Sequence, residues 1–169
     1  MYKEELLEKL RVNTRIQYDM PMTELEGIAY DDTVEQFIEM SRNVGSNVIV
    51  AKQGESLDDI VRRAYPEAKV IASDLKELTI ATLNPDTVAD AQSLNGTDVG
   101  VVAGEIGVAE NGCVWIPQQM KEKAVCFISE YLVIVLSKNS IVNNMHEAYD
   151  RITMPSTGLG TFISGPSKT

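Results

Sequence analysis

The segment Gly107-Val108-Ala109-Glu110-Asn111-Gly112-Cys113-Val114-Trp115-Ile116 indicates a turn between two extended runs. The run before it, residues 98–104, is strand-like, and residues 114–116 resume an extended pattern. Asn-Gly between two apolar runs is a strong signal for a β-hairpin, because both residues tolerate positive φ. The segment therefore predicts a hairpin, with Glu110 at the end of a strand, where α/β sheets place their binding crevices.

Upstream of the predicted hairpin, helical patterns alternate with short apolar strands. Gly45 is a typical helix end, and Ser56 is a typical helix start. The predicted helices cover residues 6–10, 32–45, 56–66 and 86–94, and the predicted strands cover residues 47–51, 69–73 and 98–104. This alternation favours an α/β fold with a mostly parallel sheet flanked by helices.

Downstream of the hairpin, the sequence is richer in strands. Residues 124–128 and 131–136 are continuous apolar runs typical of strands that are covered on both faces, and residues 161–163 form a shorter run. Ser140 can cap a helix with an apolar face that includes Ile141, Met145 and Ile152. Since no repeat or linker interrupts the pattern, we expect one domain over residues 1–169, with a helix or arm over about residues 1–30.

Composition narrows the classes of function. The chain has 169 residues, a net charge of −10 and 44% hydrophobic residues, which is typical of a globular domain. This acidity argues against binding to nucleic acid or to anionic membranes. Since the sequence has neither an apolar run of about 18 residues nor a signal-peptide pattern, we expect a cytoplasmic protein. Cys113 and Cys126 are expected to be reduced, buried thiols.

Several kinds of catalytic site have no matching motif. His146 is the only histidine, and it lies beside an apolar helix stripe, which favours a packing role. Neither a nucleophile elbow, a phosphate-binding loop nor a dinucleotide fingerprint is present. Two isolated cysteines cannot supply a four-thiolate cluster. We therefore expect no resident metal or cofactor.

Carboxylate and hydroxyl groups are what the sequence offers for chemistry. Glu110 is a candidate general base or acyl-accepting nucleophile, although a glutamate here can also simply cap the turn. The tail Ser164-Gly165-Pro166-Ser167-Lys168-Thr169 carries hydroxyls and a cation that can hold a carboxylate or phosphate, unless it is a frayed terminus.

These two stretches resemble the LUD-domain family, particularly its lactate utilisation protein C (LutC/YkgG) group. The family's Gly-[Ile/Val]-Ala-Glu-[Thr/Asn]-Gly turn is matched by residues 107–112. Its Ser-Gly-Pro-Ser-x-Thr-Ala-Asp-Ile-Glu motif is matched over its first six positions by residues 164–169. The resemblance covers residues 98–169 well, whereas the earlier residues match only in their alternation of helices and strands. The family's Ala-Asp-Ile-Glu continuation is absent, so either the sequence is shortened or this member lacks part of the site.

The resemblance implies a fold similar to the NagB/RpiA/CoA-transferase superfamily. It also implies a part in oxidising L-lactate to pyruvate with iron–sulfur partners similar to LutA and LutB. Glu110 would be the polar anchor or base. The ligand-binding residues would be Gly107, Asn111, Gly112, Ser164, Gly165, Ser167, Lys168 and Thr169.

Two other functions stay open. In CoA-transferases of that superfamily a similar Glu-Asn-Gly turn presents the nucleophile, so Glu110 is a candidate for acyl transfer. The chain is alternatively a non-catalytic scaffold subunit. An exposed edge strand is compatible with a homo-oligomer, and the sequence is compatible both with an enzyme that acts alone and with a component that needs partners.

Overall fold

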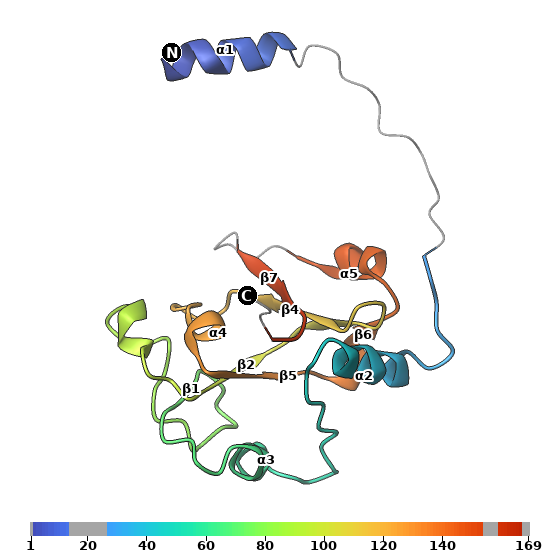
Figure 1. Ribbon diagram of the computed structural model, residues 1–169, viewed down its shortest axis with the longest axis vertical. Coiled ribbons are helices and arrows are strands. Elements are labelled where there is room, and N and C mark those ends of the chain that lie inside the picture. Colours follow the sequence, from blue (N-terminus) through green and yellow to red (C-terminus); the bar gives the residue numbers. More distant parts are fainter. Residues whose placement is uncertain (1, 14–26, 154–158, 167–169) are drawn as a thin grey trace.

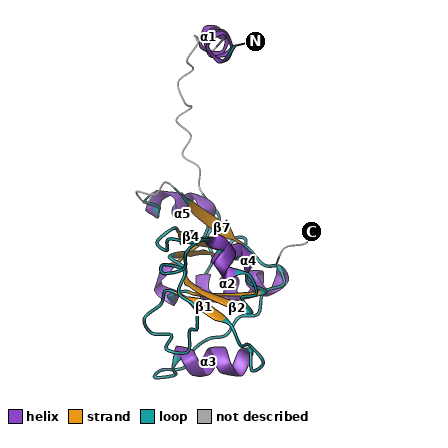
Figure 2. Ribbon diagram, turned by 90° about the vertical axis from the view of Figure 1, so that its left-hand side faces the viewer, coloured by secondary structure: helices purple, strands orange, loops and turns teal. Residues whose placement is uncertain are grey.

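The computed structural model describes residues 2–13, 27–153 and 159–166. Two β-sheets lie between helices, with α3 and α5 at opposite ends of the body (Figures 1 and 2). The helices are α1 (Lys3–Asn13), α2 (Thr33–Asn43), α3 (Leu57–Ala64), α4 (Val125–Ile128) and α5 (Met145–Arg151). The strands are β1 (Ile71–Ser73), β2 (Val99–Ala103), β3 (Ile106–Val108), β4 (Cys113–Pro117), β5 (Tyr131–Val135), β6 (Ile141–Val142) and β7 (Gly160–Ile163). Short 3-10 helices cover Ala91–Leu94 and Lys138–Ser140.

The chain passes twice from one sheet to the other, from β2 to β3 and from β5 to β6. Sheet A has the order β1-β2-β5 and is entirely parallel. Sheet B has the order β6-β3-β4-β7, in which β3 and β6 are parallel and the other pairs antiparallel. Beyond the ends of β2 and β5 the chain continues into β3 and β6, which are again neighbours. The predicted α/β class is confirmed, and its antiparallel part is the hairpin together with β7.

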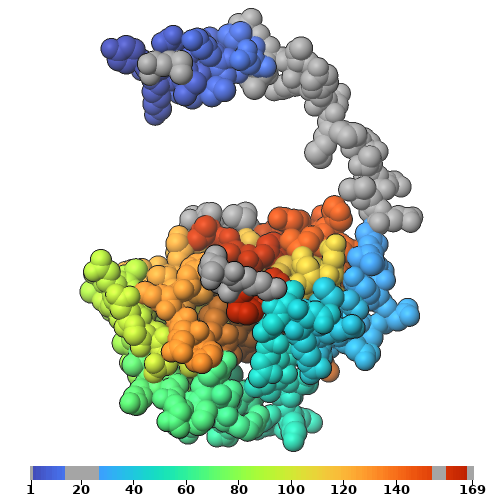
Figure 3. Space-filling view, viewed as in Figure 1, coloured from blue at the N-terminus to red at the C-terminus, as the bar shows by residue number. Residues whose placement is uncertain are grey.

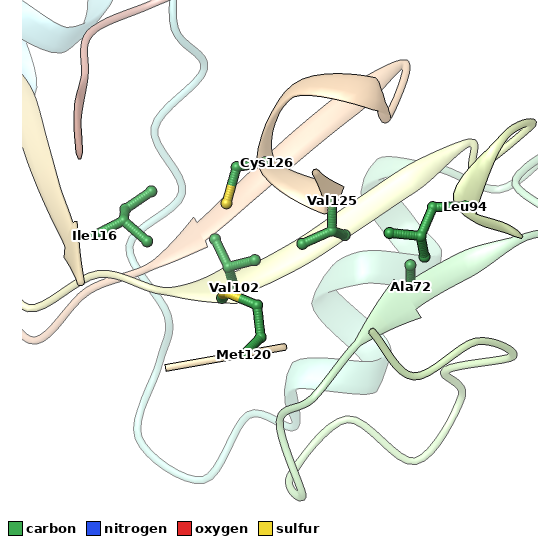
Figure 4. Packing of buried hydrophobic residues seen from close by; sticks show 7 residues of the cluster. All are labelled: Ala72, Leu94, Val102, Ile116, Met120, Val125 and Cys126. Carbon is green, nitrogen blue, oxygen red and sulfur yellow. The ribbon is translucent and has the colours of Figure 1, made fainter. Parts of the chain in front are cut away.

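Helices cover both faces of sheet A. Val99 and Val101 pack with Val61 of α3 on one face. Val102 lies on the other face, with Val125 of α4 and further buried residues from neighbouring elements (Figure 4). This alternation along β2 is the two-residue period of a strand, and residues 98–104 were predicted to be strand-like.

Sheet B is likewise packed on both faces. Val108 and Trp115 pack towards α5 through Ala148. Val114 packs with Phe37 of α2. Helices α2 and α5 thus cover the β3–β4 hairpin from opposite sides, so both helices help to position its tip.

Helix α1 stands apart from the body in Figures 1 and 3. None of its residues is buried, and its leucines are exposed. Residues 3–13 are helical, and this confirms the helix predicted over residues 6–10. No helix in the described ranges is long and apolar enough to cross a membrane.

One predicted strand is wrong. Residues 47–51 form no strand, and Ile49 and Val50 are exposed. The segment has the apolar composition of a strand, but a strand also needs a neighbouring strand to hydrogen-bond with its backbone N–H and C=O groups. None of the strand pairings found in the described residues includes this segment.

Three further predictions about helices and strands differ from the structure. Residues 124–128 are not a strand, because Val125–Ile128 form helix α4, whose buried Val125 and Cys126 pack on sheet A. Ser140 does not cap the last helix, which begins after Asn144. Residues 86–94 are helical only over Ala91–Leu94, since side-chain caps by Asn84 and Asp90 replace a continuous helix.

Two strand placements are also corrected. The first strand of the hairpin is β3, whereas the run over residues 98–104 contributes β2 to sheet A. Strand β5 lies at the edge of sheet A and is not covered throughout, because Tyr131 is 48% and Val135 37% exposed. An apolar run alone does not reveal how many neighbours a strand will have.

Candidate functional site around the Glu110 hairpin

The predicted hairpin exists, with a four-residue loop over residues 109–112. The Gly112 N–H donates to the Val108 carbonyl at 2.8 Å, and this hydrogen bond closes the loop. Gly112 adopts φ of +66°, whereas no described residue other than glycine has positive φ. Asn111 instead stabilises the turn with its side chain, whose Oδ1 accepts from the Cys113 N–H at 3.1 Å.

Glu110 lies at the exposed tip of this loop. Its Oε2 accepts a hydrogen bond of 3.0 Å from the Met145 N–H, in the first turn of α5. Its own N–H donates to the Asn143 carbonyl at 2.9 Å. One carboxylate oxygen is therefore held in place, while no hydrogen bond within the described residues occupies Oε1. A carboxylate held in this way can accept a proton or a hydrogen bond from a ligand.

Asn143 and Asn144 connect β6 to α5 beside Glu110, and neither was predicted from the sequence as a site residue. The Asn143 Oδ1 accepts hydrogen bonds from the Tyr30 N–H and the Thr33 hydroxyl, and its Nδ2 donates to Glu147. The Asn144 Oδ1 caps α5 by accepting from the Glu147 N–H. The Asn-x-x-Glu spacing of Asn144 and Glu147 is the sequence signal that could have identified this cap.

The described part of the C-terminal segment contacts the hairpin loop. The Ser164 hydroxyl donates to the Asn111 carbonyl at 3.0 Å. Gly165 has φ of +67°, and a Cβ there would lie 2.3 Å from the Val44 carbonyl oxygen. Figure 3 shows the red C-terminal residues against the cyan surface that follows α2. Ser164 thus contacts the Glu110 loop and Gly165 lies against Val44, whereas Ser167, Lys168 and Thr169 lie outside the described residues.

Helix α2 packs directly on the hairpin loop. A Cβ on Gly112 would lie 2.7 Å from the Ser41 backbone nitrogen. Ser41 is only 4% exposed, and its buried hydroxyl has no hydrogen-bond partner among the described residues. Gly107, by contrast, lies within β3 and pairs with Val114 and Ile141, so it is part of the sheet and not of the loop.

Cys113, directly after the loop, is a buried free thiol. Burial, together with the nearby negative charge of Glu110, raises the pKa of Cys113 to about 11. Its Sγ contacts the Met145 Sδ at 3.7 Å. A thiol with so high a pKa is a poor nucleophile.

Few other ionisable side chains are available near the loop. His146 is exposed in the first turn of α5 and does not pack in the core, contrary to expectation. Among the described residues, no group of three or more acidic, histidine or cysteine side chains could hold a metal ion. Among the described residues, the loop and its neighbours present the Glu110 carboxylate, several backbone groups and the Ser164 hydroxyl.

Comparison with known proteins gives a family. The LUD domain model matches residues 34–169, whereas no curated protein matches the chain. The crystal structure of a DUF162 family protein from Deinococcus radiodurans is similar, with a TM-score of 0.66 and 16% sequence identity. The match covers 82% of this chain and 90% of that chain, and at this identity it shows the fold alone. The family match spans both the hairpin and the C-terminal motif, and on that basis the chain belongs to the LUD-domain family.

Proposed function

We propose that this protein is a LutC-like, cytoplasmic component of L-lactate utilisation that binds a small carboxylate at the Glu110 crevice. Membership of the LUD-domain family supports a role associated with lactate utilisation. The observation that carries the proposal is the Glu110 carboxylate, held at Oε2 by the Met145 N–H beside the Ser164 segment.

A ligand with both a hydroxyl group and a carboxylate needs different partners in the Glu110 loop and in the C-terminal tail. Glu110 accepts a hydrogen bond or proton from the ligand's hydroxyl group. A second carboxylate beside Glu110 would be repelled, so the ligand's carboxylate needs a cation. Lys168, in the tail that continues from Ser164 and Gly165, is the residue we propose for that role.

The electrons of lactate oxidation need another carrier. Oxidising lactate to pyruvate removes two electrons and two protons, and two cysteines cannot hold a four-thiolate cluster. We therefore assign electron transfer to iron–sulfur partner proteins of the LutA and LutB type, while this chain contributes Glu110 as anchor or base.

Isothermal titration of the full-length protein with L-lactate, pyruvate and coenzyme A tests this assignment. The Glu110→Gln variant keeps an oxygen that can accept from the Met145 N–H, but it loses the charge and the basic group. We expect saturable binding of lactate or pyruvate that weakens about tenfold or more in this variant.

Glu105→Gln is the matched control, because Glu105 is an exposed glutamate before β3, at the other end of the same strand. It should bind like the unmodified protein. Binding of coenzyme A in place of the acids, lost in Glu110→Gln, would instead favour acyl transfer. Binding of none of the three would contradict a ligand site and favour the scaffold subunit.

A further inference from the structure

A cavity of about 380 Å³ lies at the amino edge of sheet A. Asp98 and Glu130 contribute to it from the positions directly before β2 and β5. Because these strands are parallel, both residues lie at the same edge, whereas the Glu110 loop follows β3 beyond the opposite edge. The lining residues are Ala64, Tyr65, Pro66, Glu67, Ala68, Asp98, Val99, Glu130 and Tyr131. The cavity is thus separate from the Glu110 loop.

Two tyrosines form the aromatic part of this cavity. The ring centroids of Tyr65 and Tyr131 are 4.9 Å apart, with an angle of 42° between the ring planes. Tyr131 is 48% exposed, so solvent reaches its side chain. Burial and the neighbouring Tyr131 raise the pKa of Tyr65, which keeps its phenol neutral. Neutral aromatic rings present a negative potential on their faces.

Carboxylates set the sign of the charge. Glu67, Asp98 and Glu130 line the cavity, and no lysine, arginine or histidine does. Asp98 accepts hydrogen bonds from the Lys69 and Val70 N–H groups at 2.7 and 2.8 Å. These bonds hold the pKa of Asp98 below its usual value, so this carboxylate is ionised at neutral pH. A cavity lined with one sign of charge attracts ligands of the opposite sign.

We propose that this cavity binds a small organic ammonium ion. Aromatic faces attract alkylammonium groups, which ring carbons can also contact through their methyl and methylene groups. The cavity volume lies within the range of small-molecule sites. A metal ion is a poorer fit, because the carboxylates at this edge do not form a metal-binding group within the described residues.

Choline is the probe for the first test, and 3,3-dimethyl-1-butanol is its uncharged counterpart of the same shape. The full-length protein, with its tyrosine rings isotope-labelled, is titrated with each compound and followed by NMR. We expect choline to shift the Tyr65 and Tyr131 resonances saturably, less strongly at high salt, and the alcohol to bind roughly tenfold more weakly. No saturable shift with choline, or equal binding of the alcohol, would overturn the proposal.

Matched variants separate the two parts of the site. Tyr131→Leu keeps apolar cover but removes the ring face, and Glu130→Gln removes one charge without changing shape. Each should weaken choline binding roughly fivefold to tenfold, measured as the dissociation constant. Glu77→Gln, at an exposed glutamate that does not line the cavity, should leave binding unchanged. If both lining variants bind choline as the unmodified protein does, while remaining folded by circular dichroism, the proposal is wrong.

Discussion

At the scale of single residues, Gly112 is the position where the loop least tolerates a side chain. Alanine there would need positive φ and would place its Cβ 2.7 Å from the Ser41 nitrogen and 2.9 Å from the Met40 carbonyl carbon. We expect Gly112→Ala to lower the free energy of unfolding by about 3 kcal/mol or more, measured by urea denaturation.

Gly54→Ala is the control for this prediction. Gly54 has φ of +80°, but nothing lies within 4 Å of its Cβ position. Gly54→Ala should lower the free energy of unfolding only by the cost of holding alanine at positive φ, about 1 kcal/mol. Equal effects of the two substitutions would show that contact with α2 does not constrain the loop.

The two cysteines should be unreactive while the protein is folded. Burial raises the pKa of Cys113 and of Cys126 to about 11. At pH 8 only about one thiol in a thousand is then ionised, so a thiol reagent such as DTNB should label both residues only after unfolding.

The same pKa values predict how stability changes with pH. The unfolded thiols lose their protons near the ordinary value of 9.0, whereas the folded ones keep them until about 11. Stability contributed by these thiols is therefore complete below pH 9 and falls as the pH rises towards 11. Rapid labelling of the folded protein at pH 8 would show that the pKa values of the two thiols are not raised, and it would contradict both predictions.

At the scale of elements, the cap of α5 decides how Glu110 is held. Asn144 is 4% exposed, accepts from the Glu147 N–H and donates to the Ile28 carbonyl at 2.8 Å. We expect Asn144→Ala to lower the free energy of unfolding by about 2 kcal/mol, measured by chemical denaturation. Ser140→Ala should change it by less than about 0.5 kcal/mol, since Ser140 does not cap this helix. The reverse order would restore the cap that the sequence first indicated.

Local sequence patterns predicted the elements whose signals are local. The hairpin follows from Asn111-Gly112, and α3 follows from the Ser56 cap, which accepts from the Asp59 N–H as expected. Residues 47–51 and 124–128 were predicted wrongly, because their final state depends on partners distant in the chain. Short apolar runs do not distinguish a strand from a buried helical turn.

The candidate site was predictable in part for the same reason. The motifs identified Glu110 and Ser164, and the fold brings both to one loop cluster. Asn143 and Met145 were missed, because their contacts with Glu110 depend on the packing of α5 against β3 and on no local pattern. Gly107 matches the motif, but it lies within β3, where it pairs with Val114 and is not part of the loop.

At the scale of the whole molecule, α1 is separable from the body. None of its residues is buried, and the family match begins at residue 34. Removal of residues 1–13 should therefore change the melting temperature by less than about 2 °C in a calorimetric scan. A large drop would mean that α1 packs against the body in solution.

We propose that the Glu110 loop, the start of α5 and the Ser164 segment form one ligand site. Amide NMR spectra of the full-length protein, recorded during titration with L-lactate, test it most directly. We predict saturable shifts for the Glu110, Met145 and Ser164 amides, and unchanged signals around Tyr65 and Tyr131. If saturating lactate leaves those three amide signals unchanged, or shifts the residues at the amino edge of sheet A instead, lactate does not bind at the Glu110 loop.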